Sequence, residues 1–221
     1  MKLQFFPVMA LALLPVLHSC TKSGFAPAPL AAVNVTNVVV GGVALTYNTT
    51  TLTVNNNNYS QLTMNAGSSQ LNLYPAASPK TPYYNQTIQT SPGDNYSLFL
   101  SGASPTGTID AVLIKESYTN YADSVCGVRF INLSPNSSPV CVNVTGQANG
   151  STVSSLAYKE YSSFIKFPAV SANPSYAFQI RDVATGNVLA SYTLTTPYFN
   201  NVTIVFRGLV SSPGITMVKN Y

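Results

Sequence analysis

Apolar and polar residues alternate with a period of two in several short stretches of the chain. Val202, Ile204 and Phe206 share one parity while the residues between them share the other, and the stretches 176–181 and 96–100 repeat the pattern. Alternation of this kind predicts β-strands with one face buried. Beyond the N-terminal leader, no stretch has the period of an amphipathic helix, so we expect an all-β fold.

The alternating stretches form two series with the same order. Four blocks of the first series match four blocks of the second, at offsets between 102 and 107 residues. The matched blocks are 58–62 with 160–164, 71–73 with 178–180, 95–102 with 201–208, and 112–118 with 215–221. Because so small a drift needs only loop insertions, we infer a duplicated unit. Turn-forming residues recur about every 8 to 12 residues, which is typical of antiparallel sandwiches of about seven strands each.

The leader indicates the compartment. Lys2 is followed by an apolar run that ends in Leu17-His18-Ser19-Cys20. This run is too short to span a bilayer comfortably and is typical of a signal peptide. Its end resembles the lipobox of bacterial lipoproteins, which implies lipidation of Cys20 and an outer membrane lipoprotein in the cell envelope of a Gram-negative bacterium, facing either the periplasm or the surface. An ordinary signal peptide followed by a chance cysteine is the alternative.

The expected fold class is therefore all-β, with two tandem antiparallel β-sandwich domains after the leader. The expected boundaries are 1–19 for the signal peptide, 20–30 for the lipid anchor and a flexible tether, 31–120 for the first sandwich and 125–221 for the second. We expect residues 125–221 to fold alone, because they contain a complete set of alternating strands. The aromatic residues expected to share their core are Phe130, Phe164, Phe178, Tyr192 and Phe206.

Charged residues make up only 7% of the chain, and the net charge of +4 has no Lys/Arg cluster behind it, so we expect no nucleic-acid partner. Arg129 and Lys166 are interpreted as solvated strand charges. The only histidine, His18, lies in the leader, which excludes the usual Ser-His-Asp and Cys-His mechanisms and a His-based zinc site. Asp94 and Asp182 lie in turn sequences, where aspartate commonly accepts hydrogen bonds from the local backbone. We expect no catalytic residue, no metal and no cofactor, and hence no enzyme.

Two cysteines, Cys126 and Cys141, remain after cleavage at Cys20. An oxidising envelope favours a disulfide between them. If their strands form a simple hairpin, however, Cys141 lies roughly 20 Å from Cys126 along the ladder, and a bridge needs Cα atoms within about 7 Å. A disulfide requires the two strands to belong to different sheets, and the pattern leaves that question open.

Two aromatic pairs each follow a proline and stand outside the alternating strands. They are Tyr83-Tyr84 and Tyr198-Phe199. Since proline fixes a turn, and exposed aromatic pairs stack on sugar rings or anchor protein partners, we predict that these four residues contact a ligand. Packing over the end of a sandwich is the alternative.

The second unit carries a more specific resemblance. The stretch 128–135, the pair Tyr161-Ser162 and the closing alternating strand that ends at Gly208 look like domain of unknown function 4397. The resemblance implies Ig-like β-sandwich domains, often in tandem, in secreted proteins and lipoproteins, and it implies no established activity. It extends over most of the second unit, but in the first unit mainly over 59–102. Where members of the family usually carry Asp after the Ser-Pro turn, this chain has Cys141.

Together these features predict a non-enzymatic cell-envelope lipoprotein whose tandem sandwiches serve interaction or assembly. The expected partners are the membrane, through the N-terminal lipid anchor, and a protein or glycan at the envelope. The alternative is a carbohydrate-binding lipoprotein associated with glycan uptake. The absence of Trp, the strongest stacking side chain on sugars, counts against this alternative.

Overall fold

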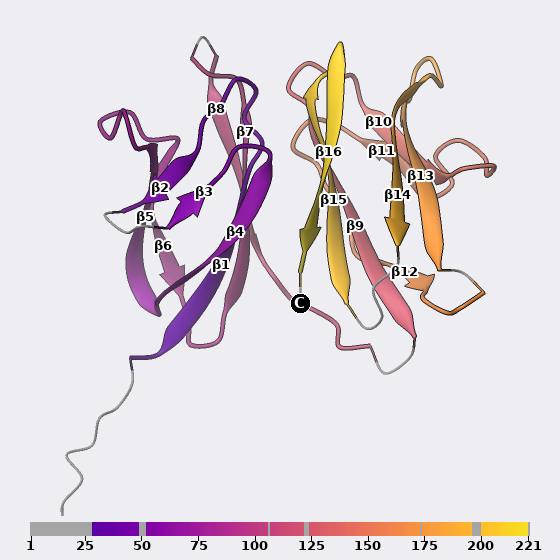
Figure 1. Ribbon diagram of the computed structural model, residues 1–221. Coiled ribbons are helices and arrows are strands. Elements are labelled where there is room, and N and C mark those ends of the chain that lie inside the picture. Colours follow the sequence, from indigo (N-terminus) through magenta and orange to yellow (C-terminus); the bar gives the residue numbers. More distant parts are fainter. Residues whose placement is uncertain are drawn as a thin grey trace, which may run out of the picture.

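The computed structural model describes residues 28–48, 52–105, 107–121, 124–172, 174–195 and 200–220. Within these ranges the chain is all-β, with sixteen strands in four four-stranded sheets (Figure 1). This confirms the predicted fold class. The described residues contain no helix long and apolar enough to cross a membrane.

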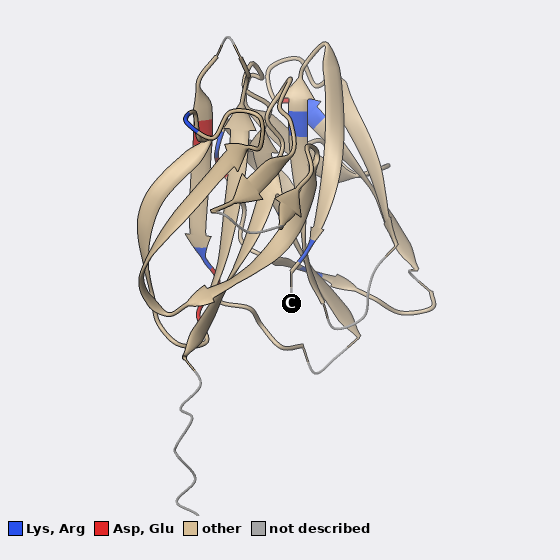
Figure 2. Cartoon of the chain, turned by 60° about the vertical axis from the view of Figure 1, so that its left-hand side comes forward, with Lys and Arg blue, Asp and Glu red and all other residues tan. Residues whose placement is uncertain are grey.

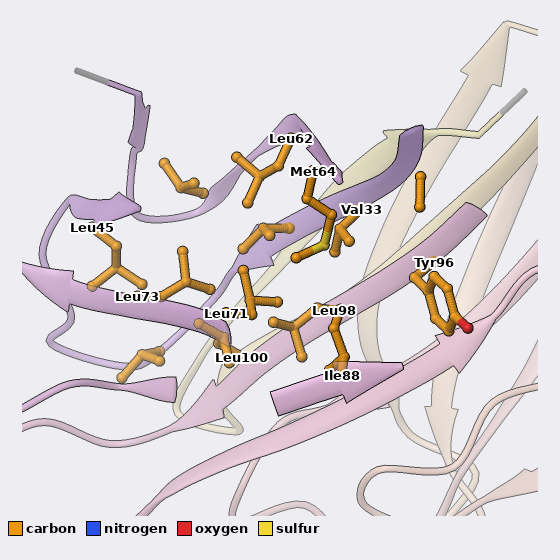
Figure 3. Close-up of a cluster of buried hydrophobic side chains, with 14 residues drawn as sticks. Val33, Leu45, Leu62, Met64, Leu71, Leu73, Ile88, Tyr96, Leu98 and Leu100 are labelled. Carbon is orange, nitrogen blue, oxygen red and sulfur yellow. The ribbon is translucent and has the colours of Figure 1, made fainter. Parts of the chain in front are cut away.

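The first eight strands form one sandwich. Their bounds are β1 (Leu30–Asn37), β2 (Leu45–Tyr47), β3 (Thr53–Val54), β4 (Asn58–Asn65), β5 (Gly67–Pro75), β6 (Tyr84–Thr90), β7 (Asn95–Gly102) and β8 (Ile109–Lys115). One sheet has the strand order β4-β1-β7-β8 and the other β3-β2-β5-β6. Neighbouring strands are antiparallel except for β1 and β7, which run in parallel. Side chains such as Val33, Leu71 and Leu98 meet between the sheets and form the core (Figure 3).

The second eight strands repeat this topology. Their bounds are β9 (Val125–Leu133), β10 (Val140–Val144), β11 (Val153–Leu156), β12 (Ile165–Pro168), β13 (Ser175–Asp182), β14 (Val188–Thr195), β15 (Asn201–Leu209) and β16 (Ser212–Lys219). The sheet orders are β12-β9-β15-β16 and β11-β10-β13-β14, which are the first two orders with every number raised by eight. The duplication inferred from the sequence thus has a structural counterpart, with eight strands described in each copy instead of about seven.

The second core differs from the expected one at one aromatic residue. Phe130, Phe178 and Phe206 are buried together, and Tyr192 packs against them. Phe164 does not belong to this cluster, because its ring packs edge-on against Tyr118, at a centroid distance of 6.1 Å. Phe164 therefore belongs to the side of the sheet that faces the first sandwich.

Matching backbone hydrogen bonds set the correspondence between the two copies. The Asn57 N–H donates to the Asn37 carbonyl, and the Lys159 N–H donates to the Asn132 carbonyl, both at 2.7 Å. Asn57 and Lys159 also share a left-handed backbone, with φ of 59° and 72°. Asn37 therefore corresponds to Asn132, and from this anchor β1 and β7 correspond residue by residue to β9 and β15.

The two sandwiches pack face to face through the sheets β4-β1-β7-β8 and β12-β9-β15-β16 (Figure 1). A third apolar cluster fills the contact between them. Its buried members are Val38, Phe99, Ile114, Ile131, Leu133, Val205 and Val218. Most of them are corresponding pairs, Val38 with Leu133, Phe99 with Val205 and Ile114 with Val218, so the interface has approximate two-fold pseudosymmetry. The sequence match of 112–118 with 215–221 is therefore wrong by one residue, because it pairs Ile114 with Met217.

Strand β15 is buried on both faces, whereas its sequence pattern predicts burial of one face only. Val202, Ile204 and Phe206 point into the second core, whereas Val205 points into the contact between the sandwiches. The first six residues of β15 are all buried. The strand is therefore covered on both faces, although its sequence alternates as if only one face were buried.

Candidate functional site

The structure places half of the predicted contact residues. Tyr83 and Tyr84 are both half-buried and pack against the first core. The expectation that both stand outside the strands is wrong for Tyr84, which is the first residue of β6. Burial also raises the pKa of the Tyr84 hydroxyl. Tyr198 and Phe199 lie outside the described residues, as does Cys20. The contact role of the aromatic pairs therefore stays a prediction.

Tyr83 lines a cleft of about 550 Å³ at one end of the first sandwich. The cleft is bounded by the loop after β1, the 76–83 loop and the loop after β7. Its apolar lining comes from Val43, Pro75, Ala77, Pro82, Tyr83 and Ile109. None of the lining residues is charged, and Ser78, Thr81 and Ser104 add hydroxyl groups. Such a lining fits an apolar side chain or the face of a sugar ring, and offers no acid–base pair for catalysis.

Local hydrogen bonds hold the wall of the cleft. The Tyr83 N–H donates to the Leu73 carbonyl at 2.8 Å, which fixes Tyr83 beside the end of β5 just before β6 begins. Within the same loop, Ser78 N–H donates to Pro75 and Thr81 N–H donates to Ser78, giving two successive turns. The aromatic ring is thus presented by a loop with a defined backbone.

The cleft lies at the end of the sandwich where both parallel strands finish. β1 starts at Leu30 and β7 at Asn95, and the loops that follow them supply Gly41 and Ser104 to the cleft. The chain therefore enters the sandwich at the opposite end, below in Figure 1. Val43, on the rim, is 51% exposed.

A buried ion pair joins the two sandwiches, although charged residues are sparse along the ribbon (Figure 2). Arg129 Nη2 and Glu116 Oε1 are 2.6 Å apart, and the two side chains are 3% and 2% exposed. Arg129 Nε also donates to Thr203 Oγ1 at 3.1 Å, and the guanidinium lies 4.6 Å from the ring centroid of Phe164. The expectation of a solvated strand charge is wrong for Arg129, because its partner comes from the other sandwich. Lys166 is exposed and lies over the Tyr121 ring.

The two cysteines are free thiols and are both buried. They lie on β9 and β10, which belong to different sheets, so the hairpin considered from the sequence does not exist. Cys126 packs in the second core, and burial raises its pKa from 9.0 to about 11. A thiol with so high a pKa is a poor nucleophile at neutral pH.

The two turn aspartates do bind local backbone. Ser91 N–H donates to Asp94 Oδ2 at 2.8 Å, and Thr185 N–H donates to Asp182 Oδ1 at 2.7 Å. These backbone hydrogen bonds are the main cause of the lowered pKa of both carboxyl groups. Among the described residues, no three His, Cys, Asp or Glu side chains gather where they could hold a metal ion.

Comparison with known proteins gives a family. A search of curated proteins finds no match to the chain. The family model described as domain of unknown function (DUF4397) matches residues 31–143, just over half of the chain. This range covers the first sandwich and continues through β9 into β10, so it includes the stretch 128–135. We expected the resemblance over most of the second unit and only in part of the first. The matched range instead covers all of the first unit and ends within β10 of the second. The chain therefore belongs to the DUF4397 family.

Proposed function

We propose that the chain is a non-enzymatic lipoprotein of the bacterial cell envelope whose tandem Ig-like sandwiches bind a protein partner through the cleft around Tyr83. The observation that carries the proposal is the place of this cleft, at the end of the first sandwich opposite the start of β1. A lipid on Cys20 and a short tether anchor the protein at that start. The cleft then points away from the membrane, where a partner can reach it.

The lining suggests how the partner is held. Val43 is exposed and Tyr83 half-buried, so an apolar side chain of the partner covers surface that is now in contact with water. Aromatic anchors often dominate an interface, with truncation costing about 2 kcal/mol or more. The second candidate ligand is a glycan, favoured by the hydroxyl groups of Ser78, Thr81 and Ser104 beside the tyrosine ring.

Val43→Asp tests the proposal without touching the core. The exposed position tolerates a charge, but the charge has to be desolvated when an apolar group enters the cleft. We expect the purified variant to lose binding to envelope proteins in a quantitative retention assay, with its melting temperature unchanged. The matched control is Val183→Asp, which places the same charge on a loop valine that is 45% exposed in the second sandwich.

Tyr83→Ala tests the ring itself, because its removal weakens an apolar protein contact and a stacked sugar alike. A glycan array read in parallel identifies a sugar ligand. Binding unchanged in Val43→Asp, or lost equally in Val183→Asp, would contradict a binding role for the cleft.

The anchor is tested at Cys20. Replacing Cys20 with Ala should stop lipid labelling and leave an uncleaved or soluble product, because the acylated thiol is then missing. Metabolic labelling with a radioactive or clickable fatty acid, followed by fractionation, measures both effects. Undiminished acyl labelling of the variant rules the assignment out.

A further inference from the structure

One edge of the contact between the sandwiches carries a closed polar network. Tyr158, in the turn between β11 and β12, is hydrogen-bonded to Ser101 Oγ at 2.9 Å and donates to Asp110 Oδ2 at 3.0 Å. Lys159 Nζ pairs with Asp110 Oδ1 at 3.0 Å. At this edge the Asp110 carboxylate is paired with the Lys159 ammonium group, and Tyr158 bridges the two sandwiches.

Pseudosymmetry relates this edge to the opposite one. Ser101 and Asp110 are paired across β7 and β8, and Arg207 and Gly214 are paired across β15 and β16. In each pair the first residue is followed by a glycine of positive φ. Gly102, after Ser101, has a φ of 94°, and Gly208, after Arg207, has a φ of 81°. Arg207 thus takes the place of Ser101, and Gly214 takes the place of Asp110.

The third position follows from the turn before β4. Asn57 corresponds to Lys159 through its backbone hydrogen bond and its positive φ, so the preceding residue, Asn56, corresponds to Tyr158. At the opposite edge the tyrosine is therefore an asparagine, the serine an arginine and the aspartate a glycine. The acid and the ring that close the first edge are both missing from the second.

A cleft of about 190 Å³ occupies the space that these replacements leave, lined by Asn56 and Gly41 from the first sandwich and by Arg207 and Ser212 from the second. Within the described residues, no carboxylate pairs with Arg207, which is half-buried. Asn56 Oδ1 is buried and accepts no hydrogen bond from any residue that the structure describes. Across the described ranges, the first sandwich thus contributes an oxygen without a hydrogen-bond donor, and the second contributes a guanidinium without a carboxylate.

Hydrogen bonds hold the guanidinium in place. Arg207 Nε donates to Thr216 Oγ1 at 2.7 Å, and Thr216 Oγ1 donates across the contact to the Asn57 carbonyl at 3.1 Å. The guanidinium lies over Gly214, where a Cβ would come within 2.6 Å of Nη1. Burial lowers the pKa of Arg207, because the charged guanidinium loses water around it.

We propose that this cleft binds a small carboxylic acid that carries a hydrogen-bond donor beside its carboxylate. The carboxylate pairs with Arg207, as the side chain of Asp110 pairs with Lys159 at the other edge, and the donor bonds to Asn56 Oδ1. A planar guanidinium suits a carboxylate because it offers two parallel N–H donors. The cleft is smaller than the pockets of about 300 Å³ or more that hold drug-sized ligands, so it accepts a single sugar acid or a chain end.

Titration of the full chain with three probes tests the site. Sodium D-glucuronate carries a carboxylate with hydroxyl neighbours, N-acetylglycine represents the carboxyl end of a peptide, and D-glucose is the neutral counterpart of glucuronate. We expect a millimolar dissociation constant by NMR or calorimetry for at least one of the two acids, as befits a ligand of few atoms, and none for glucose. The better acid identifies the source of the carboxylate. Binding of neither acid, or equal binding of glucose, overturns the proposal.

Two variants locate the binding. Arg207→Gln should weaken acid binding about tenfold or more, whereas Arg181→Gln, at a half-buried arginine on β13, should leave it unchanged. Gly214→Asp places an acid where the other edge has one, and its Cβ requires the Arg207 guanidinium to shift, so the variant should abolish binding; its melting temperature shows whether it stays folded. A folded Gly214→Asp protein that binds the acid as well as the parent chain overturns the proposal. Because neither variant touches Tyr83 or Val43, failure here leaves the proposed binding function standing.

Discussion

At the scale of single residues, the ion pair of Arg129 and Glu116 shows how the two copies have diverged. The residue that corresponds to Arg129 in the first copy is Asn34, which donates one hydrogen bond to the Lys219 carbonyl at 3.3 Å. In the second copy, Arg129 forms a bidentate ion pair with Glu116, and both side chains are buried. The same position thus forms a weak contact in one copy and a buried charge pair in the other.

Removing one partner of this pair should destabilise the protein strongly. We expect Glu116→Gln to lower the free energy of unfolding by about 3–5 kcal/mol, because Arg129 is left as an uncompensated buried charge. Urea denaturation measures the change. The control is the double variant Arg129→Met/Glu116→Leu, which removes both charges and should lose much less. If the double variant is as unstable as the single one, packing of the side chains matters more than charge.

The two thiols give a second prediction at this scale. Cys126 and Cys141 should not react with a thiol reagent such as dithionitrobenzoate in the native protein, because both are buried and the pKa of Cys126 is raised to about 11. Both should react once the chain is unfolded in denaturant, without a reducing agent. A native protein that shows no free thiol even when unfolded has a disulfide, which contradicts the structure.

At the scale of elements, the strands of the contact sheets are buried on both sides. In β9, Phe130 points into the second core while Ile131 and Leu133 point toward the first sandwich. Independent folding of residues 125–221 stays a prediction. Separation of the halves would expose this second apolar face together with Arg129.

The isolated segment 125–221 should therefore melt below the full chain and self-associate. Exposed apolar surface is worth about 25 cal/mol per Å², and the pseudosymmetric face is suited to a second copy of itself. Thermal denaturation and sedimentation velocity measure the two effects. Val205→Asp in the same segment is the control, since a charge in the face should restore a monomer. A monomeric parent segment as stable as the full chain would show that the contact contributes little.

The sequence allowed the strands to be predicted better than their partners. Alternation located the long strands, but the two-residue β3 is too short to show a period, so about seven strands were expected instead of eight. The parallel pairing of β1 with β7 joins residues far apart in the chain and leaves no local pattern. Cys126 and Cys141 were compared within a hairpin for the same reason.

The candidate sites divide in a similar way. Tyr83 was found because a proline and an aromatic pair make a visible local pattern. The cleft at Arg207 has no such signal, since its two polar residues, Asn56 and Arg207, come from different sandwiches and meet only through the contact between them. Its signal lies in the comparison of corresponding positions, which requires the register of both copies.

At the scale of the whole molecule, the contact between the sandwiches makes stability depend on alkaline pH. Tyr158 lies in this contact, and burial, the largest cause, raises its pKa from 10.0 to about 12. The unfolded chain then releases this proton at a lower pH than the folded protein does. Its contribution to stability is therefore intact below pH 10 and is lost as the pH rises from about 10 to about 12.

Tyr158→Phe should flatten this loss. The variant lacks the hydrogen bonds to Ser101 and Asp110, so it starts less stable near neutral pH, but its stability should fall less between pH 10 and pH 12. Melting temperatures across this range measure the difference. Tyr161→Phe, at an exposed tyrosine of the second sandwich, is the control. Parallel pH curves for the parent and Tyr158→Phe would contradict the assignment.

The short joint between β8 and β9 determines how the two sandwiches find each other. Because it links faces that fit together, each half meets its partner at a local concentration of about the millimolar order, far above that of a second chain in solution. The joint thus favours pairing of the two halves within one chain, although both faces remain suited to the matching half of another copy. A joint too short to let the chain fold back on itself would leave every first half to pair with a neighbour's second half. The result is a swapped dimer or an open-ended row of molecules, depending on whether the exchange closes.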